Sequence, residues 1–510
     1  MLPQILPQQR WFGAKGRVIH KASLLEQGEW QTPLGNWLLA MVEVDLEGRS
    51  RQTYSLPLAL AWEQGDGSSI DALLHCTLAR VRQRARVGVL YDAFWDDAFC
   101  RASVLAMKEN LARPMDGGEL RWRSTARLAK IDVTNLPVKH PAFEQSNTLV
   151  ILGERVVLKG YRRLRRGINS EIEIGRFLTE VSPFKHIAAL LGSLEHVDAN
   201  GETTAVAVAH AYVSNEGSGW DYATAHLSRL LDDTLARQAT PTDATAVVAT
   251  AADVADSTVL RGGFRSLMET LGTRTAQLHL ALAKPSGDPA FDPEPFNDED
   301  VAALRKKLQQ EAQLTVELLA SRVDTLSDAV RESAQRLLEM AQALHGHASA
   351  IVPDTIEAAK TRYHGDFHLG QVLISKHDFV IVDFEGEPSR PLEERRAKHS
   401  PLRDVAGMLR SFGYAAAVAA QERARSPEDH ARIAESLGQW RRETTEAFLV
   451  GYRNAIDGAA SHPRNEETFT RLVAAFTLEK SLYELRYELA NRPDWIAIPL
   501  NAILELVAAP

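Results

Sequence analysis

Two aspartates, Asp366 and Asp383, have the residue type and spacing that most directly suggest chemistry in this sequence. They are the first and last residues of the segment DFHLGQVLISKHDFVIVD, and Gln371 follows Asp366 by five residues. The apolar runs at 372–375 and 379–383, separated by a polar turn, predict a hairpin whose ends lie close together. One carboxylate can then take the proton of an acceptor hydroxyl, while the other and the amide oxygen hold Mg²⁺ on nucleotide phosphates. The pattern therefore predicts phosphoryl transfer that uses ATP and Mg²⁺.

The same spacing is found in protein kinases, where Asn follows the Asp of His-Arg-Asp by five residues and Asp-Phe-Gly comes later. Here the corresponding strings are HGD at 364–366, Gln371, and DFE at 383–385. Most loop aspartates only end turns or cap helices. That is the alternative for each one alone, but their joint occurrence favours function. For His364 the sequence leaves two interpretations open, a direct role and a loop-supporting one.

A lysine for the nucleotide phosphates is predicted at Lys159. It ends the predicted strand at 155–159, the second strand of the hairpin TLVILGERVVLKG, and a helix is predicted from 169 to about 181. Kinases hold such a lysine with a glutamate of the following helix. Glu171 is the favoured partner and Glu173 the alternative. A plain strand-end lysine paired with any surface acid is the competing interpretation.

The phosphate-covering loop departs from the kinase pattern, because no G-x-G-x-x-G precedes Lys159. The sequence Gln-Ser-Asn-Thr stands in its place, and we expect its side chains and backbone amides to cover the phosphates, mainly those of Ser146, Asn147 and Thr148. The apolar strand predicted at 205–213 would lead into a hinge. We expect the backbone of Ala211 and Val213 to face adenine.

Around these residues the chain changes from strands to helices. Short apolar and aromatic runs bounded by glycines predict strands in the first part, whereas Ala, Leu, Glu and Arg dominate after Trp220. The predicted elements are strands at 37–45 and 53–62, helices at 73–81 and 96–108, a helical region at 220–353 interrupted by a Pro, Gly and Asp-rich loop at 284–300, and a helix at 476–507 broken at Pro493.

Composition excludes several classes of protein. The 510 residues carry 58 Lys plus Arg and 67 Asp plus Glu, a net charge of −9, which disfavours general nucleic-acid binding. Only Cys76 and Cys100 are present, so no disulfide scaffold or Cys-rich metal site is expected. The first ten residues lack the pattern of an export signal, and no apolar run approaches the roughly 20 residues of a membrane span. We expect a cytoplasmic protein that binds neither membranes nor nucleic acid.

Several strings of this sequence resemble those of bacterial maltokinases. The resemblance runs from residue 10 to about 500 and is carried by RWFGAKGR at 10–17, EQSNT at 144–148, HGDFHLGQV at 364–372, DFEGEP at 383–388, RDVAGMLRSF at 403–412 and NRPDW at 491–495.

The resemblance implies an α+β fold of the bilobal kind found in protein kinases and aminoglycoside phosphotransferases. The expected parts are a β-rich N-terminal cap at 1–95, an intermediate segment with the kinase N-lobe at 96–212, and a helical C-lobe at 213–510 that contains the catalytic hairpin at 363–385. The implied reaction transfers phosphate from ATP to maltose. Its product, maltose 1-phosphate, feeds α-glucan and glycogen synthesis from trehalose, and trehalose synthase is the implied partner protein.

Carried onto this sequence, the family pattern makes Asp366 the catalytic base, Lys159 the phosphate lysine, and Gln371 and Asp383 the magnesium ligands. Glu385 is expected to touch magnesium through water. The sequence departs from the pattern at Gly413, where an acidic residue is usual, and in the long acidic loop that ends at residue 300. The first departure concerns the identity of the acceptor.

The acceptor is expected near Asp366 and His368 and along one predicted helix. Aromatic and acidic residues recur there at three- and four-residue spacings, which suits stacking on a sugar and hydrogen bonding to its hydroxyls. A packed core stripe is the alternative. The residues are Glu479, Tyr483, Glu484, Tyr487 and Glu488, with Arg492 and Trp495 in the segment that follows.

Two other functions compete with maltose phosphorylation. A glucosamine kinase, or another small-molecule kinase of the same fold, would need an acidic pocket for the amine. A pseudokinase that serves as a docking module has no need of the complete set Lys159, Asp366, Gln371 and Asp383. The sequence leaves open the acceptor, the oligomeric state, the regulation and the role of the loop at 284–300.

Overall fold

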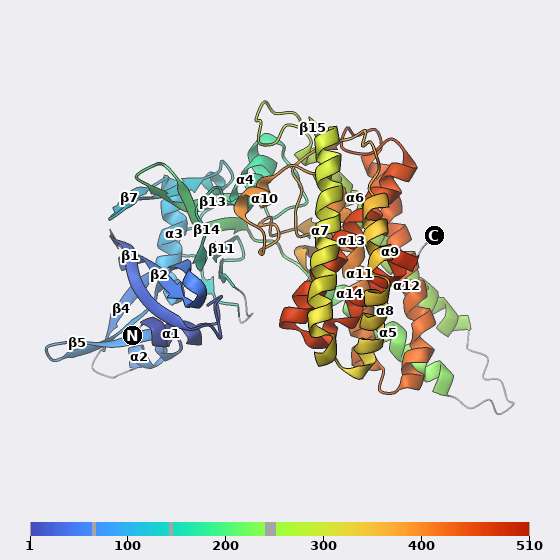
Figure 1. Ribbon diagram of the computed structural model, residues 1–510. Helices are drawn as coiled ribbons and strands as arrows, with labels where there is room; N and C mark the ends of the chain where they lie inside the picture. Colours follow the sequence, from blue (N-terminus) through green and yellow to red (C-terminus); the bar gives the residue numbers. More distant parts are fainter. Residues whose placement is uncertain (1, 64–67, 142–145, 240–250, 509–510) are drawn as a thin grey trace. The chain divides into compact units, whose positions relative to one another are not determined.

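The computed structural model describes residues 2–63, 68–141, 146–239 and 251–508 (Figure 1). The chain divides into two compact units, residues 1–214 and residues 215–510. The first is rich in strands, drawn blue to green in Figure 1, and the second is mostly helical. The predicted α+β class, with a β-rich N-terminal part and a helical C-terminal part, is confirmed.

The first unit is built on antiparallel strands with a few short helices. Its strands are β1 (Ile19–Thr32), β2 (Gly35–Leu46), β3 (Ser50–Ser55), β4 (Leu58–Trp62), β5 (Thr77–Gln83), β6 (Arg86–Asp92), β7 (Ala112–Met115), β8 (Gly118–Ser124), β9 (Val138–Lys139), β10 (Thr148–Leu152), β11 (Val156–Gly160), β12 (Arg163–Leu164), β13 (Leu190–Asp198) and β14 (Thr203–Ala211). Its helices are α1 (Leu2–Ile5), α2 (Ser68–Asp71), α3 (Asp97–Glu109) and α4 (Ser170–Arg176), which continues as a π-helical turn, η6 (Phe177–Val181).

These strands form two sheets. One has the order β12-β3-β2-β4-β6-β5, with β1 paired to β2, and the other has the order β7-β8-β13-β14-β11-β10-β9. The hairpin predicted around Lys159 is confirmed as β10 and β11, which pair Leu149 with Lys159. Its turn has positive φ at Gly153 and Glu154, 58° and 52°, as in the tight turns that match the twist of paired strands.

Two predictions for the first unit are wrong. The single strand at 53–62 is broken into β3 and β4, because Pro57 has no N–H to contribute to a ladder. The helix at 73–81 is a 3₁₀ turn followed by β5, which pairs with β6 from Thr77 onward. The apolar spacing there fits a helix, but the cross-strand pairing of β5 outweighs this local preference. The strand β1 was not predicted.

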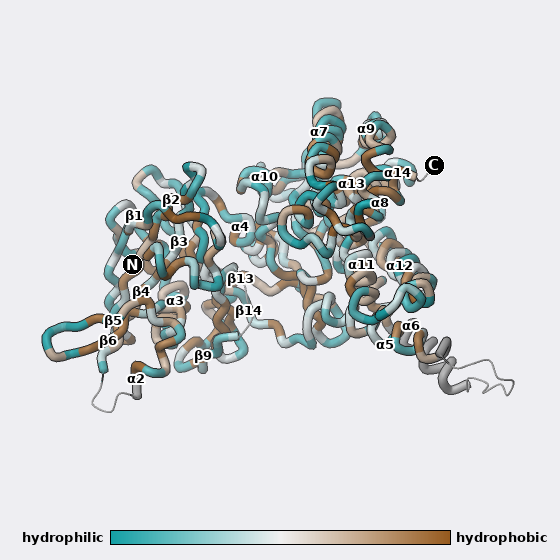
Figure 2. Tube along the Cα trace, turned by 60° about the horizontal axis from the view of Figure 1, so that its bottom comes forward, coloured by the Kyte–Doolittle hydropathy of each residue, from teal (hydrophilic) through white to brown (hydrophobic). Residues whose placement is uncertain are grey.

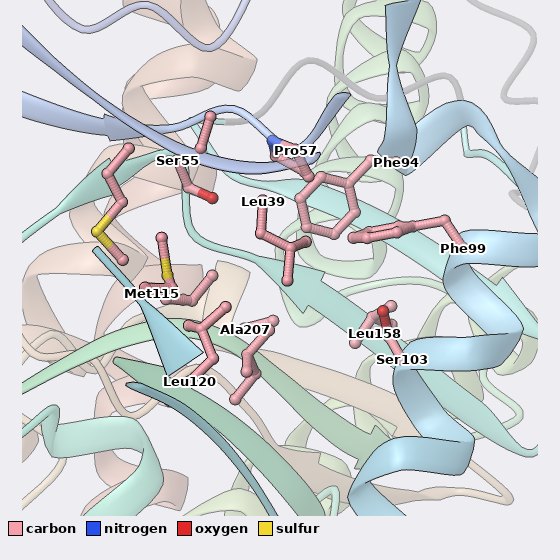
Figure 3. Close-up of a pocket in the computed structure, with 14 residues that line it drawn as sticks. Leu39, Ser55, Pro57, Phe94, Phe99, Ser103, Met115, Leu120, Leu158 and Ala207 are labelled. Atoms are coloured by element: carbon pink, nitrogen blue, oxygen red, sulfur yellow. The ribbon is translucent and has the colours of Figure 1, made fainter. Parts of the chain in front are cut away.

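The core of the first unit lies between its two sheets and α3. A void of about 20 Å³ remains there, room for about one water molecule, and Figure 3 shows the apolar side chains around it. Leu39 comes from one sheet, Leu120 and Leu158 come from the other, and Phe99 comes from α3. We assign this void to core packing and not to a ligand site.

The second unit is a helical bundle with small strand pairs. Its helices are α5 (Gly219–Ala239), α6 (Ala251–Leu282), α7 (Asp298–Arg322), α8 (Asp328–Glu339), α9 (Ala341–Ala350), α10 (Leu392–Arg396), α11 (Leu402–Arg423), α12 (Pro427–Ile456), α13 (Glu466–Asn491) and α14 (Ala497–Ala508). The strand pairs are β15 (Glu294–Pro295) with β16 (Ala359–Lys360), and β17 (Val372–Ser375) with β18 (Asp378–Ile381).

Helix α7 shows why this region folds as a bundle. Val301, Leu304, Leu308 and Leu319 of α7 are buried at helical spacing, and Figure 2 shows apolar and polar residues alternating along it. The helix begins after Asn297, whose side chain and that of Asp300 form a reciprocal capping box. The predicted loop at 284–300 therefore ends three residues early.

The C-terminal helices follow the predicted break at Pro493. Helix α13 ends at Asn491, and α14 begins after a 3₁₀ turn that contains the proline. Within the described ranges, the structure has no helix with both the length and the apolar character of a membrane span.

Candidate active site

The hairpin β17–β18 positions the candidate metal ligands. Lys376 and His377 form its turn with positive φ, 53° and 60°, which matches the right-handed twist of the two strands. At the open end, the N–H of Val382 donates to the carbonyl of Gln371 at 3.0 Å. The amide Nε2 of Gln371 donates to Asp383 Oδ2 at 3.2 Å. The predicted convergence of Gln371 and Asp383 is therefore present.

Asp383 has an unusual backbone. Its φ is +68°, a left-handed conformation that costs a residue with a side chain roughly 1–2 kcal/mol and that aspartate tolerates better than most. Such conformations persist where the surroundings impose them, often at functional sites. The next residue, Phe384, is buried and packs against the ring of His364, with centroids 4.9 Å apart. This packing anchors the segment that carries Asp383.

His364 supports the loop that carries Asp366. Its Nε2 lies 2.9 Å from the carbonyl of Val382, to which it donates, and its Nδ1 accepts from the N–H of Asp366 at 3.3 Å. The residue is 1% exposed. Both ring nitrogens are used inside the protein, which favours the loop-supporting interpretation.

A buried carboxylate that sequence reasoning missed holds the same loop. Asp404 of α11 accepts hydrogen bonds from the N–H groups of His364 at 2.7 Å and Gly365 at 2.9 Å. His279 of α6 lies 3.1 Å from the same carboxylate and 3.0 Å from the hydroxyl of Tyr452. Gly365 has φ +86°, a conformation that glycine adopts without strain. The string RD at 403–404 belonged to the family-like segments, but nothing in it indicated this contact.

Asp366 lies beside a lysine from α13 that was also missed. Lys480 Nζ is 3.5 Å from Asp366 Oδ1 and 3.3 Å from Glu387 Oε1. Burial opposes ionisation of Asp366, but the positive charge of Lys480 outweighs burial and lowers the pKa of Asp366. The carboxylate of Asp366 is therefore ionised at neutral pH and can accept a proton or a hydrogen bond.

Asp366 opens into a small pocket that contains more charged groups. The buried Glu479 lies 3.0 Å from Arg403, 3.5 Å from Arg390 and 3.6 Å from Lys307. Burial raises the pKa of Glu479, but these cations outweigh it and lower the pKa to about 2. The lining residues are Tyr363, Gly365, Asp366, Phe367, Glu387, Arg390, Arg403, Asp404, Gly407, Phe476, Glu479, Lys480 and Tyr483.

Of the predicted acceptor-binding residues on α13, Glu479 and Tyr483 line this pocket. Farther along, Glu484 pairs with Arg410 at 2.8 Å, and Glu488 pairs with Arg492 at 2.7 Å. These two pairs belong to a second cluster that the structure forms next to the pocket.

The same cluster contains the remaining aromatic residues of the prediction. Trp495 stacks on Tyr414 with centroids 6.1 Å apart, and the guanidinium of Arg492 lies 5.3 Å from the ring of Tyr487. Tyr487 is 43% exposed. A sugar contact by Glu484, Tyr487, Glu488, Arg492 or Trp495 stays a prediction.

His368 and Glu385 flank the hairpin. The Nδ1 of His368 accepts from the N–H of Gly370 at 3.0 Å, and burial lowers the pKa of this histidine, which favours the neutral ring. The carbonyl of Glu385 accepts from Arg395 at 3.3 Å. Oxygen atoms of Gln371, Asp383 and Glu385 are the hard ligands that Mg²⁺ prefers, so the donor chemistry of this segment fits magnesium.

In the first unit, Lys159 is held by Glu171, which resolves the choice between Glu171 and Glu173. The Lys159 amine lies 2.9 Å from Glu171 Oε2, and both side chains are buried. Helix α4 presents Glu171 in its first turn, because the side chain of Asn169 caps the N–H groups of its first residues. The predicted ion pair is therefore present.

Two further residues hold the same carboxylate. Tyr161 donates its hydroxyl to Glu171 Oε2, and His210 Nε2 lies 3.1 Å from Glu171 Oε1. Burial raises the pKa of Glu171, but Lys159 and His210 outweigh it, and the net direction is strongly downward. Nothing in the sequence indicated Tyr161 or His210 as partners.

The predicted nucleotide-covering residues are only partly described. Gln145 lies outside the described residues, whereas Ser146 is exposed and Asn147 is half-buried. The hydroxyl of Thr148 accepts from Arg162 Nε at 2.6 Å, so Thr148 has a structural contact. All three roles stay predictions.

The predicted adenine contacts stand at the end of β14. The N–H of Ala211 donates to the carbonyl of Ala189 at 2.8 Å, so an adenine contact at Ala211 cannot use this group. Val213 follows two residues later. Its role also stays a prediction.

Comparison with known proteins agrees with the expected N-terminal part. Residues 6–96 match the maltokinase N-terminal cap domain. The resemblance to maltokinases is therefore confirmed for the cap, which the sequence placed at 1–95.

Two curated relatives are named glucosamine kinase. The protein of Streptacidiphilus jiangxiensis is 27% identical over 238 residues, which cover 46% of this chain and about half, 48%, of that protein. The protein of Mycolicibacterium smegmatis (strain ATCC 700084 / mc(2)155) is 25% identical over 418 residues, 81% of this chain and 88% of its own. These relatives support a sugar kinase and leave the sugar open.

The fold is shared with a solved structure. A glucosamine kinase in complex with glucosamine, ADP and inorganic phosphate superimposes with a TM-score of 0.60 and 20% identity, and the match covers 99% of each chain. The kinase-like fold expected from the sequence is therefore confirmed.

Proposed function

We propose that this protein transfers a phosphoryl group from ATP to a neutral sugar, with maltose as the acceptor and maltose 1-phosphate as the product. The observation that carries the proposal is the setting of Asp366. Its carboxylate is ionised beside Lys480 at the wall of a small polar pocket, next to the hairpin that carries Gln371 and Asp383.

The proposed chemistry divides among the described residues. Asp366 orients the acceptor hydroxyl and takes its proton as the phosphoryl group arrives. Lys480 keeps Asp366 ionised and is itself kept protonated: burial lowers its pKa, but Glu387 and Asp366 outweigh this and raise it. Lys159, fixed by Glu171, is assigned to the nucleotide phosphates.

Magnesium, when bound, neutralises charge on the nucleotide phosphates. Gln371 and Asp383 are the proposed ligands, and Glu385 is assigned to a water-mediated contact. The hydrogen bond between Gln371 and Asp383 holds their side chains together, and Phe384 packed on His364 keeps the following segment in place. These two contacts support the proposal, because they would hold Gln371 and Asp383 in place before magnesium binds.

The charge balance of the pocket favours a neutral acceptor over an amino sugar. A protonated amine is best bound by a carboxylate that has no other cation. In this pocket Glu387 contacts Lys480 and Arg390, and Glu479 contacts Arg403, Arg390 and Lys307. An added ammonium group would lie close to these cations. Hydroxyl groups of a neutral sugar can hydrogen-bond to both signs of charge.

Glucosamine remains the second candidate because the two curated relatives reported above are named glucosamine kinase. The proposal would then require the amine to displace one of the cations from Glu387 or Glu479. A docking module without catalysis is less well supported, because a scaffold has no need of Lys159, Asp366, Gln371 and Asp383 together.

The test is to incubate the protein with ATP and magnesium and to offer maltose, glucose, glucosamine and an aminoglycoside separately. Phosphorus NMR identifies the phosphorylated position. Protein with Asp366→Asn serves as the control for contaminating kinases. Maltose 1-phosphate as the main product supports the proposal, whereas faster turnover of glucosamine replaces it by the second candidate. ATP turnover with none of these acceptors contradicts both.

The partner implied by the maltokinase resemblance is also a proposal. Trehalose synthase would supply maltose, and its physical association with this chain can be tested by co-purification and by analytical ultracentrifugation of the mixed proteins.

A further inference from the structure

A second polar pocket lies in the first unit, apart from the residues assigned above. It has a volume of about 350 Å³ and is formed where the two sheets of this unit meet. One wall comes from β1, β2, β3 and β12 and the other from β13 and β14. The lining residues are Leu25, Glu26, Met41, Arg51, Gln52, Thr53, Arg163, Leu164, Arg165, Arg166, His196, Asp198 and Thr204.

The pocket is positively charged in a chain whose net charge is −9. Four arginines face two carboxylates, and both carboxylates already have partners. Glu26 lies 2.8 Å from the buried His196, and Asp198 accepts hydrogen bonds from the N–H groups of Asn200 and Glu202, each at 2.9 Å. These two carboxylates therefore compete only weakly with a ligand anion for the arginine side chains.

One of these arginines, Arg166, is only loosely paired. Arg166 and Glu202 are 3.9 Å apart and both substantially exposed, so this pair contributes little. Arg51 lies 2.9 Å from Asp45, outside the pocket. A guanidinium whose acidic partner is exposed, as that of Arg166 is, can exchange it for a better anion, and a phosphate accepts two parallel hydrogen bonds from it.

We propose that this pocket binds a phosphorylated sugar. The arginines would take the phosphate, and Gln52, Thr53 and Thr204 line the same wall with amide and hydroxyl groups suited to sugar hydroxyls. The volume is in the range of small-ligand sites. A β-bulge of β1 between Leu24 and Glu26 interrupts the regular pairing at this wall, as bulges do where a side chain must be re-aimed. The binding proposal does not depend on the reaction proposed above.

The arginine segment also connects the two residues of the buried ion pair. Strand β11 ends one residue after Lys159, β12 contains Arg163, and α4 begins one residue before Glu171. The segment is tied to both sheets: Arg163 pairs with Tyr54 of β3, and the N–H of Gly167 donates to Thr203 at 2.7 Å. A ligand held by Arg163, Arg165 and Arg166 would thus act on the connection between Lys159 and Glu171. We infer that its binding changes the affinity for ATP, and by linkage ATP changes its affinity equally.

The test measures binding by calorimetry in protein that carries Lys159→Met, so that the nucleotide site is weakened. The probes are maltose 1-phosphate, glucose 1-phosphate, inorganic phosphate and maltose. The variant Arg163→Gln with Arg166→Gln removes two pocket charges, and Arg80→Gln on β5 is the matched control. We expect the double variant to bind the sugar phosphates at least tenfold more weakly and the control to bind as the parent does.

Each outcome decides the proposal. Sugar phosphates that bind equally to the double variant and the control overturn it. Inorganic phosphate that binds as tightly as the sugar phosphates overturns the sugar part and leaves a phosphate site. Since all three arginines changed here are exposed, folding should survive, and unchanged melting temperatures and circular dichroism verify this.

The coupling is tested separately in protein with the native Lys159. A saturating sugar phosphate should change the KM for ATP at least twofold in the parent and not in the double variant. An equal change in both proteins would place the effect at the active site and contradict the coupling. If the sugar phosphate binds but the KM for ATP does not change, the coupling is contradicted and the ligand site is still supported. Neither result depends on which sugar is the acceptor.

Discussion

The ion pair Lys159–Glu171 and the ion pair Lys480–Asp366 differ in how the chain builds them. The first joins a strand and the helix that follows it, twelve residues apart, and both side chains are buried. The second joins the loop before β17 to α13, near the other end of the chain, and both side chains are partly exposed at a pocket. The first pair is suited to hold a lysine in place, and the second is suited to react with a ligand.

The two pairs also differ in the number and closeness of the partners that each carboxylate has within the protein. Glu171 is surrounded by Lys159, Tyr161 and His210, so its hydrogen-bonding capacity is filled by the protein. Asp366 has Lys480 at 3.5 Å, a longer contact, and it faces the pocket. A filled carboxylate positions its neighbours, whereas a carboxylate with a loose partner can take a proton.

The largest expected effect is the loss of the reacting carboxylate. Asp366→Asn keeps the size of the side chain but removes the proton acceptor, which is worth roughly 10²–10⁴ in rate. We expect kcat to fall by about that factor while magnesium-dependent ATP binding, measured by calorimetry, stays near the parental value. The ligands Gln371 and Asp383 are untouched by this change.

The matched variant is Asp383→Asn. It removes charge from the proposed magnesium site, so ATP binding should weaken, and raising the magnesium concentration should recover part of the activity by mass action. If Asp366→Asn is instead the variant that magnesium rescues, the roles of the two aspartates are reversed.

The second prediction concerns stability in the first unit. Glu171→Gln leaves Lys159 and His210 without their anion in a buried site, and breaking such a pair costs about 3 kcal/mol. Glu173→Gln, two residues away and only half-buried, should cost well under 1 kcal/mol. Urea unfolding of both variants measures the difference. Equal losses of unfolding free energy would mean that Glu171 is not the dominant partner of Lys159.

The Lys159–Glu171 and Lys480–Asp366 pairs also show which contacts can be predicted from the sequence and which cannot. The hairpin β10–β11, the helix after it and the Lys159–Glu171 pair follow from local patterns, because all lie between Thr148 and Arg176. The hairpin β17–β18 is local for the same reason. Lys480 and Asp404 contact the Asp366 loop only after α11 and α13 pack beside it, and no local signal specifies that packing.

Contacts with distant parts of the chain also explain what local patterns could not predict elsewhere. The spacing at 73–81 fits a helix, but pairing with β6 makes it a strand. On α13 the sequence left a sugar-binding stripe and a packed core stripe open, and in the structure residues one turn apart lie in two places, the Asp366 pocket and the Arg410 and Arg492 cluster. Helix periodicity gives the face, and only the neighbouring helices decide what each turn of that face contacts.

The third prediction tests the loose partner of Asp366. In the parent, Lys480 outweighs burial and lowers the pKa of Asp366. Lys480→Met removes that cation, so burial then raises the pKa and Asp366 takes up a proton at a higher pH. The acidic limb of the pH profile of kcat/KM should therefore move to higher pH. Lys307→Met, which contacts Glu479 and not Asp366, is the control. An unmoved limb for Lys480→Met would show that Lys480 does not set the ionisation of Asp366.

The smallest effect is expected from two tyrosines that are one turn apart on α13. Tyr483 lines the pocket with Asp366, and Lys480 Nζ lies 5.1 Å from its ring centroid. Tyr487 is 43% exposed and lies beside Arg492 in the neighbouring cluster. Tyr483→Ala removes a stacking surface, worth about 1 kcal/mol, and should raise the KM for the sugar about fivefold with little change in the KM for ATP. Tyr487→Ala should change either constant less than twofold. If Tyr487→Ala raises the KM for a disaccharide more than that for a monosaccharide, the acceptor extends from the Asp366 pocket into the second cluster. The separation of α13 into a binding part and a structural part would then be wrong.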